Sequence, residues 1–288
     1  MSAVYKRELR AYLHNVYGWL FMAITLLAVG FMMFLDNLVS GMPHIEYALS
    51  DSQYALLLLI PILCMRSMAE DKHNKTDMFY LSLPLKTSSV VLGKYLAMLT
   101  IYAVPCLVIC AYPLILGSFG TVNYLSAYLS ILLYLILGAA LIAVCQFLSS
   151  LTDNLVVAAV LGVVASALSL FSPVLSHMLP DTAIISFVGF VVLALLLTAV
   201  AFLVTRNLNV TAITAAAVVV PLSVVYILTQ DSFKGLFPAA LEFISPFAHF
   251  AAFCEYGTLS IQSLILLLSY PVLFVFLTVQ SADKKRWD

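Results

Sequence analysis

Eight long apolar runs divide the chain, and this pattern constrains its fold more than any other feature. The runs cover residues 16–35, 54–69, 90–116, 124–148, 155–175, 184–204, 210–228 and 259–279. A membrane-spanning helix needs about 20 apolar residues, and all but the short second run come close to that length. Apolar residues make up 64% of the chain and charged residues only 9%, which excludes a soluble globule and a basic nucleic-acid-binding surface. The sequence therefore predicts an all-α, polytopic membrane protein with about eight transmembrane helices.

The positions of the basic residues predict how these helices are oriented. With the N-terminus placed in the cytoplasm, 12 of the 13 lysines and arginines fall in cytoplasmic segments, and only Lys234 falls outside. Lysine and arginine favour cytoplasmic loops, so this distribution supports an even number of spans with both termini inside. Seven acidic residues, Asp36, Glu46, Asp51, Asp181, Asp231, Glu242 and Glu255, then lie in outer segments.

Residues 1–15 form the first of three segments that are neither spans nor short turns. Lys6, Arg10 and His14 recur at spacings of four and share one helical face, and Arg7 adds another positive charge. Tyr5, Leu9, Tyr12 and Val16 share another face. This pattern predicts a helix in the membrane interface with its basic face toward anionic lipid headgroups. The alternative is that these basic residues only flank the cytoplasmic end of the first span, as positive charges commonly do.

Residues 70–89 form the only sizeable cytoplasmic loop. It begins with the charged sequence EDKHNKT, continues as MFYLSL and then reaches Pro84. The apolar side chains Met78, Phe79, Leu81 and Leu83 suit a short helix that ends at this proline. Such a helix is either a docking surface for another protein or lies flat on the membrane.

Residues 231–257 form the only sizeable outer segment. It contains Pro238, Pro246 and seven aromatic residues, and it is too interrupted to span a membrane as one helix. We expect a re-entrant or surface-lying helical hairpin, partly buried in protein or at the interface.

The sequence lacks the motifs of the common membrane enzymes and of an ATPase. No span carries a charged residue near its middle, and Arg66 and Lys94 lie near cytoplasmic ends, where long side chains can snorkel to water. There is no HExxH, no G-x-S-x-G and no G-x-x-x-x-G-K-[ST] phosphate loop. We therefore expect no catalytic residue, metal site or cofactor on this chain, and any use of ATP requires a partner.

Five stretches of the chain resemble the permease subunits of bacterial ABC-2 type exporters, in particular the gliding-motility and nitrous-oxide-cluster branch. The main one is RSMAEDKHNKTDMFYLSLPLKTSSVVLGKYLA, residues 66–97. KRELRAYL near the start, SSLTDNLVVAA at 149–159, and ISPFAHFAAF with FLTVQSADKKRW near the end agree in order and spacing. The chain departs from the family at Lys75, where glycine is usual, and at Gln280, where arginine is common.

The resemblance implies how the chain is organised. The family usually has six spans, so residues 176–230 would be an extra two-span insertion in a single transmembrane domain. The remaining parts would be an interfacial helix (1–15), spans one and two (16–69), a coupling loop (70–89), spans three to five (90–175), the outer hairpin (231–257), and the last span with its basic tail (258–288).

The resemblance also implies a role for the cytoplasmic loop. In such exporters this loop carries the coupling helix that docks on a separate ATPase subunit, which binds ATP and magnesium. The expected apolar contacts are Met78, Phe79 and Leu83, followed by Pro84, and the expected polar rim is Glu70, Asp71 and Lys72, with Thr76 at the family's threonine position. A second permease subunit, as a homo- or heterodimer in the plasma membrane of a bacterium, is implied as well.

Two other classes of function remain open at this stage. A membrane enzyme acting on lipid or peptide would need polar groups near one interface, and only Glu242, His249 and Glu255 in the outer segment qualify. An ATP-independent carrier or channel would usually need buried charges or inverted repeats, and the sequence shows neither.

Overall fold

The structure is a computed structural model that describes residues 1–75, 86–205, 230–257 and 260–284, together with isolated positions between 217 and 226. Over these residues all regular secondary structure is helical, as predicted. The chain divides into two compact units, residues Met1–Leu170 with Pro246–Asp288, and residues Phe171–Ser245. The predicted insertion, residues 176–230, falls within the range of the second unit.

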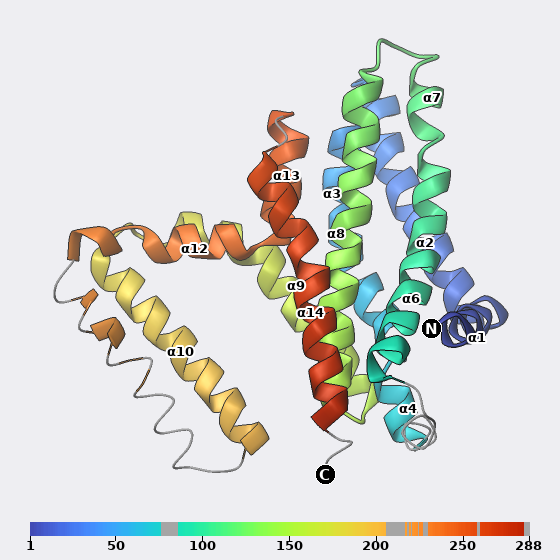
Figure 1. Cartoon of the computed structure of the whole chain (residues 1–288). Coiled ribbons are helices and arrows are strands. Elements are labelled where there is room, and N and C mark those ends of the chain that lie inside the picture. Colours follow the sequence, from blue (N-terminus) through green and yellow to red (C-terminus); the bar gives the residue numbers. More distant parts are fainter. Residues whose placement is uncertain are drawn as a thin grey trace. The chain divides into compact units, whose positions relative to one another are not determined.

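The first unit is a helical bundle (Figure 1). Its elements are α1 (Ser2–His14), α2 (Val16–Met33), the π-helix η1 (Phe34–Val39), α3 (Ile45–Cys64), α4 (Ala69–His73), α6 (Thr87–Ile109), α7 (Tyr112–Leu116), α8 (Tyr124–Leu151), most of α9 (Leu155–Met178), α13 (Pro246–Tyr256) and α14 (Ile261–Lys284). The helices α1 and α4 and the C-terminal end of α14 lie at the same end of this unit, and the turn between α7 and α8 lies at the other end (Figure 1).

Six helices of the described chain are long and apolar enough to cross a membrane, and α12 with α13 would add a seventh if they form one broken span. Five of the six follow the predicted runs within a few residues. The predicted run 184–204 corresponds to α10, and most of 210–228 lies outside the described residues. The protein is thus an all-α, multi-pass membrane protein, and a count of eight spans stays a prediction.

The second span differs from its prediction because α3 begins at Ile45 and not at residue 54. Polar residues between Glu46 and Gln53 interrupt the apolar run, but helical hydrogen bonds satisfy the backbone whatever the side chains are. Ile45, Ala48, Leu49 and Leu56 are completely buried and lie on one helical face. Glu46 and Asp51, which were expected in an outer loop, therefore belong to α3.

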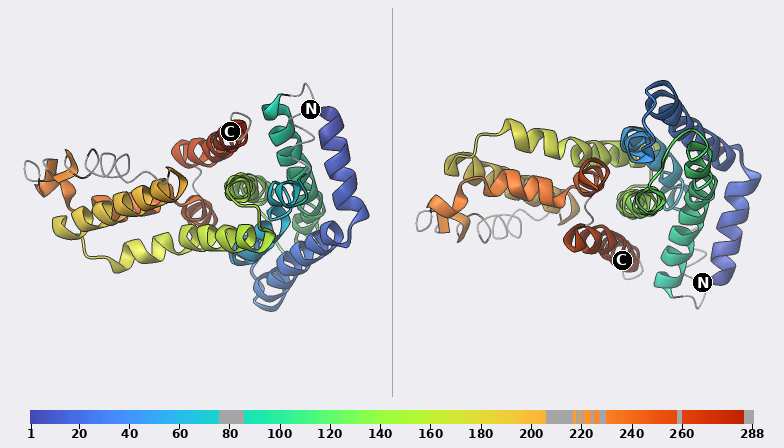
Figure 2. Two further views of the ribbon diagram at one scale, coloured as in Figure 1. Left: turned by 90° about the horizontal axis from the view of Figure 1, so that it is seen from below. Right: turned by 90° about the horizontal axis from the view of Figure 1, so that it is seen from above.

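Helix α8 lies at the centre of the first unit, where it packs against α3, α6, α13 and α14 (Figure 2). Its Gly138 faces the Tyr102 ring of α6, and a Cβ atom at this glycine would overlap that ring. The Tyr102 hydroxyl donates a hydrogen bond to the Tyr134 carbonyl at 2.8 Å. Small residues on α8 thus let a buried tyrosine of α6 lie against its backbone.

The second unit contains the end of α9, α10 (Ala183–Thr205), the 3-10 helix η2 (Gln230–Phe233) and α12 (Leu236–Ile244). Phe237 of α12 packs edge-on against Phe190 of α10, with ring centroids 5.3 Å apart. Its backbone N–H donates to the Ser186 hydroxyl at 3.3 Å. The described part of this unit is therefore held by aromatic packing between α10 and α12.

The predicted outer hairpin consists of two short helices. Helix α12 ends at Ile244, Ser245 has an extended backbone, and α13 begins at Pro246. Proline suits the first position of a helix because its missing N–H needs no partner there. The placement of these two helices relative to a membrane stays a prediction.

Candidate functional site

Helix α1 lies along α6 at the end of the bundle that also holds α4 (Figures 1 and 2). Val4, Glu8 and Tyr12 are buried at spacings of four, so one face of α1 is turned toward the protein. A Cβ atom at Gly93 of α6 would lie 3.1 Å from a Val4 methyl, so glycine permits this close approach. The apolar face was predicted at Tyr5, Leu9, Tyr12 and Val16, and the prediction is only partly right. Tyr5 and Leu9 are half-buried, whereas Val16 is the first residue of α2 and is 74% exposed.

The opposite side of α1 carries the predicted basic residues Lys6 and Arg10, which are exposed. Arg7 is also exposed but lies at the edge of this side, where it lines both the polar pocket described below and a surface hollow that Lys6, Arg10 and His14 also line. This arrangement suits a helix whose outer face meets an anionic surface.

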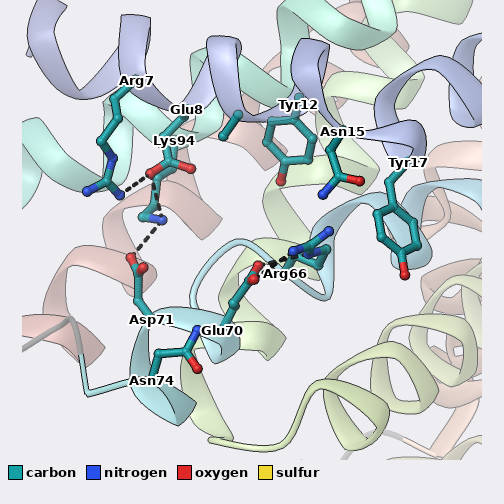
Figure 3. Close-up of a pocket in the computed structure, with 11 residues that line it drawn as sticks. Arg7, Glu8, Tyr12, Asn15, Tyr17, Arg66, Glu70, Asp71, Asn74 and Lys94 are labelled. Atoms are coloured by element: carbon teal, nitrogen blue, oxygen red, sulfur yellow. Dashed lines mark hydrogen bonds and ion pairs between the residues drawn. The ribbon is translucent and has the colours of Figure 1, made fainter.

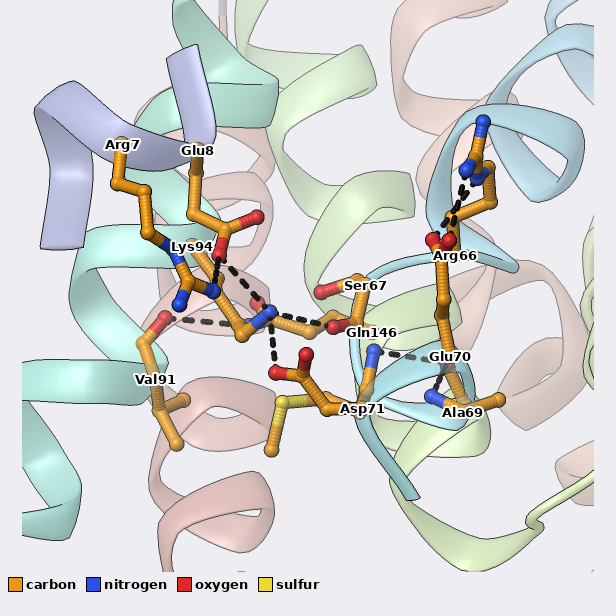
Figure 4. A network of polar contacts seen from close by, with 12 residues as sticks. Arg7, Glu8, Arg66, Ser67, Ala69, Glu70, Asp71, Val91, Lys94 and Gln146 are labelled. Atoms are coloured by element: carbon orange, nitrogen blue, oxygen red, sulfur yellow. Dashed lines mark hydrogen bonds and ion pairs between the residues drawn. The ribbon is translucent and has the colours of Figure 1, made fainter. Parts of the chain in front are cut away.

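Lys94 is the centre of a buried charge cluster at this end of α6, and its residue is only 3% exposed. Its ammonium lies 2.8 Å from Asp71 Oδ2 and 3.3 Å from Glu8 Oε1, and it donates to the Ser67 carbonyl at 2.7 Å (Figure 4). An ammonium has three N–H donors, so these three acceptors satisfy it completely. Arg7 Nη2 donates to Glu8 Oε1 at 2.6 Å and balances the remaining charge. We call Arg7, Glu8, Asp71 and Lys94 the Lys94 cluster.

The predicted snorkelling of Lys94 is therefore wrong. Its side chain stays inside the protein because Glu8 arrives from α1 and Asp71 from α4. Two carboxylates offset the cost of removing an ammonium from water.

A second ion pair fixes the turn between α3 and α4. Arg66 donates from Nε and Nη2 to the two oxygens of Glu70, at 2.8 and 2.7 Å. The guanidinium also lies over the Tyr17 ring of α2, with Cζ 4.7 Å from the ring centroid. Two parallel hydrogen bonds fix the direction of the side chain as well as its charge.

Helix α4 is also bound to the end of α8. The Ser149 hydroxyl accepts hydrogen bonds from the backbone N–H groups of Met68 and Ala69, at 3.3 and 3.1 Å. These are donors at the start of α4 that no residue within the helix can satisfy. Lys72 donates to the Ser150 carbonyl and lies 3.8 Å from Asp153. The start of the loop is thus capped from outside by another helix.

Two further hydrogen bonds join the remaining elements. The Gln146 amide of α8 donates to the Val91 carbonyl of α6 at 3.1 Å. The Tyr12 hydroxyl donates to the Leu63 carbonyl near the end of α3 at 3.3 Å. Burial raises the pKa of the Tyr12 phenol well above its ordinary value, so the hydroxyl keeps its proton for this bond.

A polar pocket of about 370 Å³ is lined by the Lys94 cluster, the Arg66–Glu70 pair, Tyr12 and Asn15 (Figure 3). The Lys94 cluster lies on one side of it and the Arg66–Glu70 pair on the other (Figure 3). The pocket therefore lies where α1, α4 and α6 meet.

The structure places only part of the predicted coupling surface. Glu70, Asp71 and Lys72, the predicted polar rim, all pair with residues of this chain. Their contact with a partner stays a prediction. Thr76, Met78, Phe79, Leu83 and Pro84 lie outside the described residues.

The sequence did not predict the contacts made by Glu8, Lys94 and Ser149. Glu8 does carry a signal, because it is an acidic residue at the four-residue spacing shared by Val4 and Tyr12. The three polar residues considered for a membrane enzyme, Glu242, His249 and Glu255, do not all belong to one unit. His249 contacts the Ser263 hydroxyl at 2.9 Å, whereas Glu242 belongs to the second unit.

Comparison with known proteins supplies the family. The family model described as "ABC-2 family transporter protein" matches residues 6–208, more than two thirds of the chain. No curated protein and no solved structure matches the chain. The matched range begins in α1 and includes the Lys94 cluster, the loop and the helices α2 to α10. The chain therefore belongs to the ABC-2 transporter family and is a multi-pass membrane protein of its permease type.

Proposed function

We propose that this chain is the permease subunit of an ABC-2 type exporter. It would move its substrate outward across the plasma membrane of a bacterium, using ATP hydrolysed by a separate ATPase subunit. The family membership supports a transport role. Because the sequence has no phosphate-loop motif, our proposal places ATP and magnesium on the partner. The narrower likeness to the gliding-motility and nitrous-oxide-cluster branch supports a bacterial source.

The observation that carries this proposal is the attachment of α4 to three other elements. Asp71 binds Lys94 of α6, Lys94 binds Glu8 of α1, and Ser149 of α8 caps the first turn of α4. Buried ion pairs with satisfied hydrogen bonds hold their partners in one geometry. A movement imposed on the loop would therefore displace α1, α6 and α8 together.

The loop continues directly from α4 into the predicted coupling residues 76–84. Their sequence offers apolar anchors, Met78, Phe79 and Leu83, beside charged neighbours, which is the composition of a protein–protein contact. Docking of an ATPase at these residues would transmit its closure to the spans as a shift between two states.

The remaining parts of the proposed assembly follow from the family likeness. A second permease subunit, identical or homologous, would form the other wall of the translocation path. Membrane lipid would contact the exposed basic face of α1, where Lys6 and Arg10 lie.

Affinity purification of the full-length tagged chain from its native membrane, followed by mass spectrometry, tests the proposal. We expect a soluble protein with a Walker A motif to be recovered with the wild type and with Phe79→Leu, which keeps an apolar anchor. Phe79→Asp would bury a carboxylate and reduce recovery at least about tenfold. Recovery of the wild-type chain alone would contradict the proposed function, and full recovery with Phe79→Asp would contradict the docking residue.

A further inference from the structure

An apolar groove adjoins the polar pocket, because Tyr12, Tyr17 and Arg66 line both. The groove has a volume of about 70 Å³ and runs between α2 and α3. Its other lining residues are Leu20, Phe21, Ile24, Leu59, Ile62 and Leu63. Phe21, Leu59 and Leu63 are buried, whereas Leu20, Ile24 and Ile62 are exposed, so the groove has a closed floor and open rims. A ligand that fills both spaces would need a polar head and an apolar chain.

Arg66 stands where the two spaces meet and has hydrogen-bond donors to spare. A guanidinium has five N–H groups, and Glu70 receives two of those of Arg66. The described part of the chain gives the other three no acceptor. Lys94, in contrast, has used all three of its donors. An anionic group of a ligand is therefore expected at Arg66, and a phosphate matches its planar donor geometry.

The charges of the pocket indicate a ligand without net charge. Three cations, Arg7, Arg66 and Lys94, are balanced by three anions, Glu8, Glu70 and Asp71. An anionic headgroup would add a negative charge that nothing in the pocket balances. Glu70 accepts one bond at each oxygen, and its side chain is 32% exposed, so lone pairs remain for an N–H donor beside Arg66.

From these observations we infer that the pocket and groove bind a zwitterionic aminophospholipid of the phosphatidylethanolamine class. The first part of one acyl chain would lie in the groove between α2 and α3, the phosphate would bind Arg66, and the primary ammonium would reach Glu70. This order along the protein is the order of these groups along the lipid. A phosphatidylcholine has no N–H to donate, and a phosphatidylglycerol has no cation. The inference does not depend on the presence of an ATPase.

Native mass spectrometry of the full-length chain in detergent tests this inference. The protein is equilibrated with equal amounts of phosphatidylethanolamine, phosphatidylcholine and phosphatidylglycerol that carry the same acyl chains. A hydrogen bond to a charged group is worth about tenfold or more in affinity, so we expect about tenfold more retention of the ethanolamine lipid. Equal retention of the three lipids, or a preference for phosphatidylglycerol, would overturn the inference.

Two variants distinguish the groove from the general lipid surface. Leu20→Trp adds a bulky ring at the groove rim and is expected to lower retention of the ethanolamine lipid about tenfold. Leu27→Trp, on the same helix at a more exposed position outside the groove, is the control and should retain it. If Leu20→Trp does not assemble, Ile24→Trp makes the same test. Unchanged retention in the groove variants would overturn the inference, and so would equally strong binding of glycerophosphoethanolamine, which has no acyl chains.

Discussion

The Lys94 ammonium lies 2.8 Å from the Asp71 carboxylate and joins the second turn of α6 to the short helix that begins the loop. Glu8 approaches the same ammonium from α1. One buried cation thus holds together three separate elements, α1, α4 and α6. In the proposed exporter, this cluster would connect the ATPase-docking loop to the membrane-spanning helices.

Replacement of Lys94 by methionine should strongly destabilise the protein. Methionine keeps most of the side-chain volume but leaves Glu8 and Asp71 without their shared cation, and removal of one partner of a buried pair costs about 3–5 kcal/mol. Thermal unfolding in detergent should show a clear fall in Tm. The control is Lys86→Met, because Lys86 is exposed at the start of α6 and its loss should cost less than about 0.5 kcal/mol.

Neutralising the carboxylates should recover part of that loss. In the triple variant Lys94→Met, Glu8→Gln, Asp71→Asn, no uncompensated buried carboxylate remains at these positions. We expect its Tm to lie above that of Lys94→Met alone, because the penalty comes mainly from unpaired charge. A triple variant less stable than the single one would show that Lys94 acts through packing.

Ser149→Ala should weaken the attachment of the loop to α8. The variant removes the acceptor of two backbone N–H groups at the start of α4 and should cost about 1 kcal/mol, as losses of helix caps usually do. Hydrogen exchange of the Met68 and Ala69 amides should become faster. Ser150→Ala is the matched control, because that hydroxyl bonds to Phe147 within its own helix. Equal exchange rates in the two variants would contradict the capping role.

Gly138→Ala should disrupt the contact between α6 and α8. The added methyl would overlap the buried Tyr102 ring, and overpacking of a core typically costs about 1–3 kcal/mol. Gly120→Ala makes only ordinary contact, with Pro43, and should leave the Tm nearly unchanged. Identical melting of the two variants would contradict the close approach.

Labelling with a membrane-impermeant maleimide tests the predicted orientation. Lys6 and Ser118 are both exposed and lie toward opposite ends of the first unit, in α1 and in the turn after α7. With Cys110 replaced by alanine, Ser118→Cys should react in intact cells and Lys6→Cys only after permeabilisation. The reverse result would invert the topology.

The fold could be predicted from the sequence to the extent that it depends on apolar length. The spans α2, α8, α9 and α14 follow their runs closely because burial in lipid requires about 20 apolar residues. The start of α3 could not be found in this way, since its first turns bury polar residues such as Glu46, Ser52 and Gln53 together with apolar ones. A search for helical periodicity at Ile45, Ala48 and Leu49 would have extended it.

The candidate site was only partly predictable, because its central contacts are between distant residues. The spacing of Lys6 and Arg10 predicted an amphipathic helix, and both side chains are exposed. The pairing of Glu8 with Lys94 joins residues 86 positions apart, and no local pattern identifies such a partner. The resemblance indicated that the loop docks on a partner, but tertiary packing decides which residues at its start, such as Asp71, face into the protein.

Photo-crosslinking from position 79 in native membranes tests the central claim most directly, namely that the loop after α3 docks on a separate ATPase. A benzophenone amino acid is introduced in place of Phe79 and, as a control, in place of Leu27, which is exposed on α2. We predict a light-dependent adduct between position 79 and a soluble protein that carries a Walker A motif, and no such adduct from position 27. If position 79 forms adducts only with lipid or with this chain itself, the account of this loop as an ATPase-docking element is contradicted.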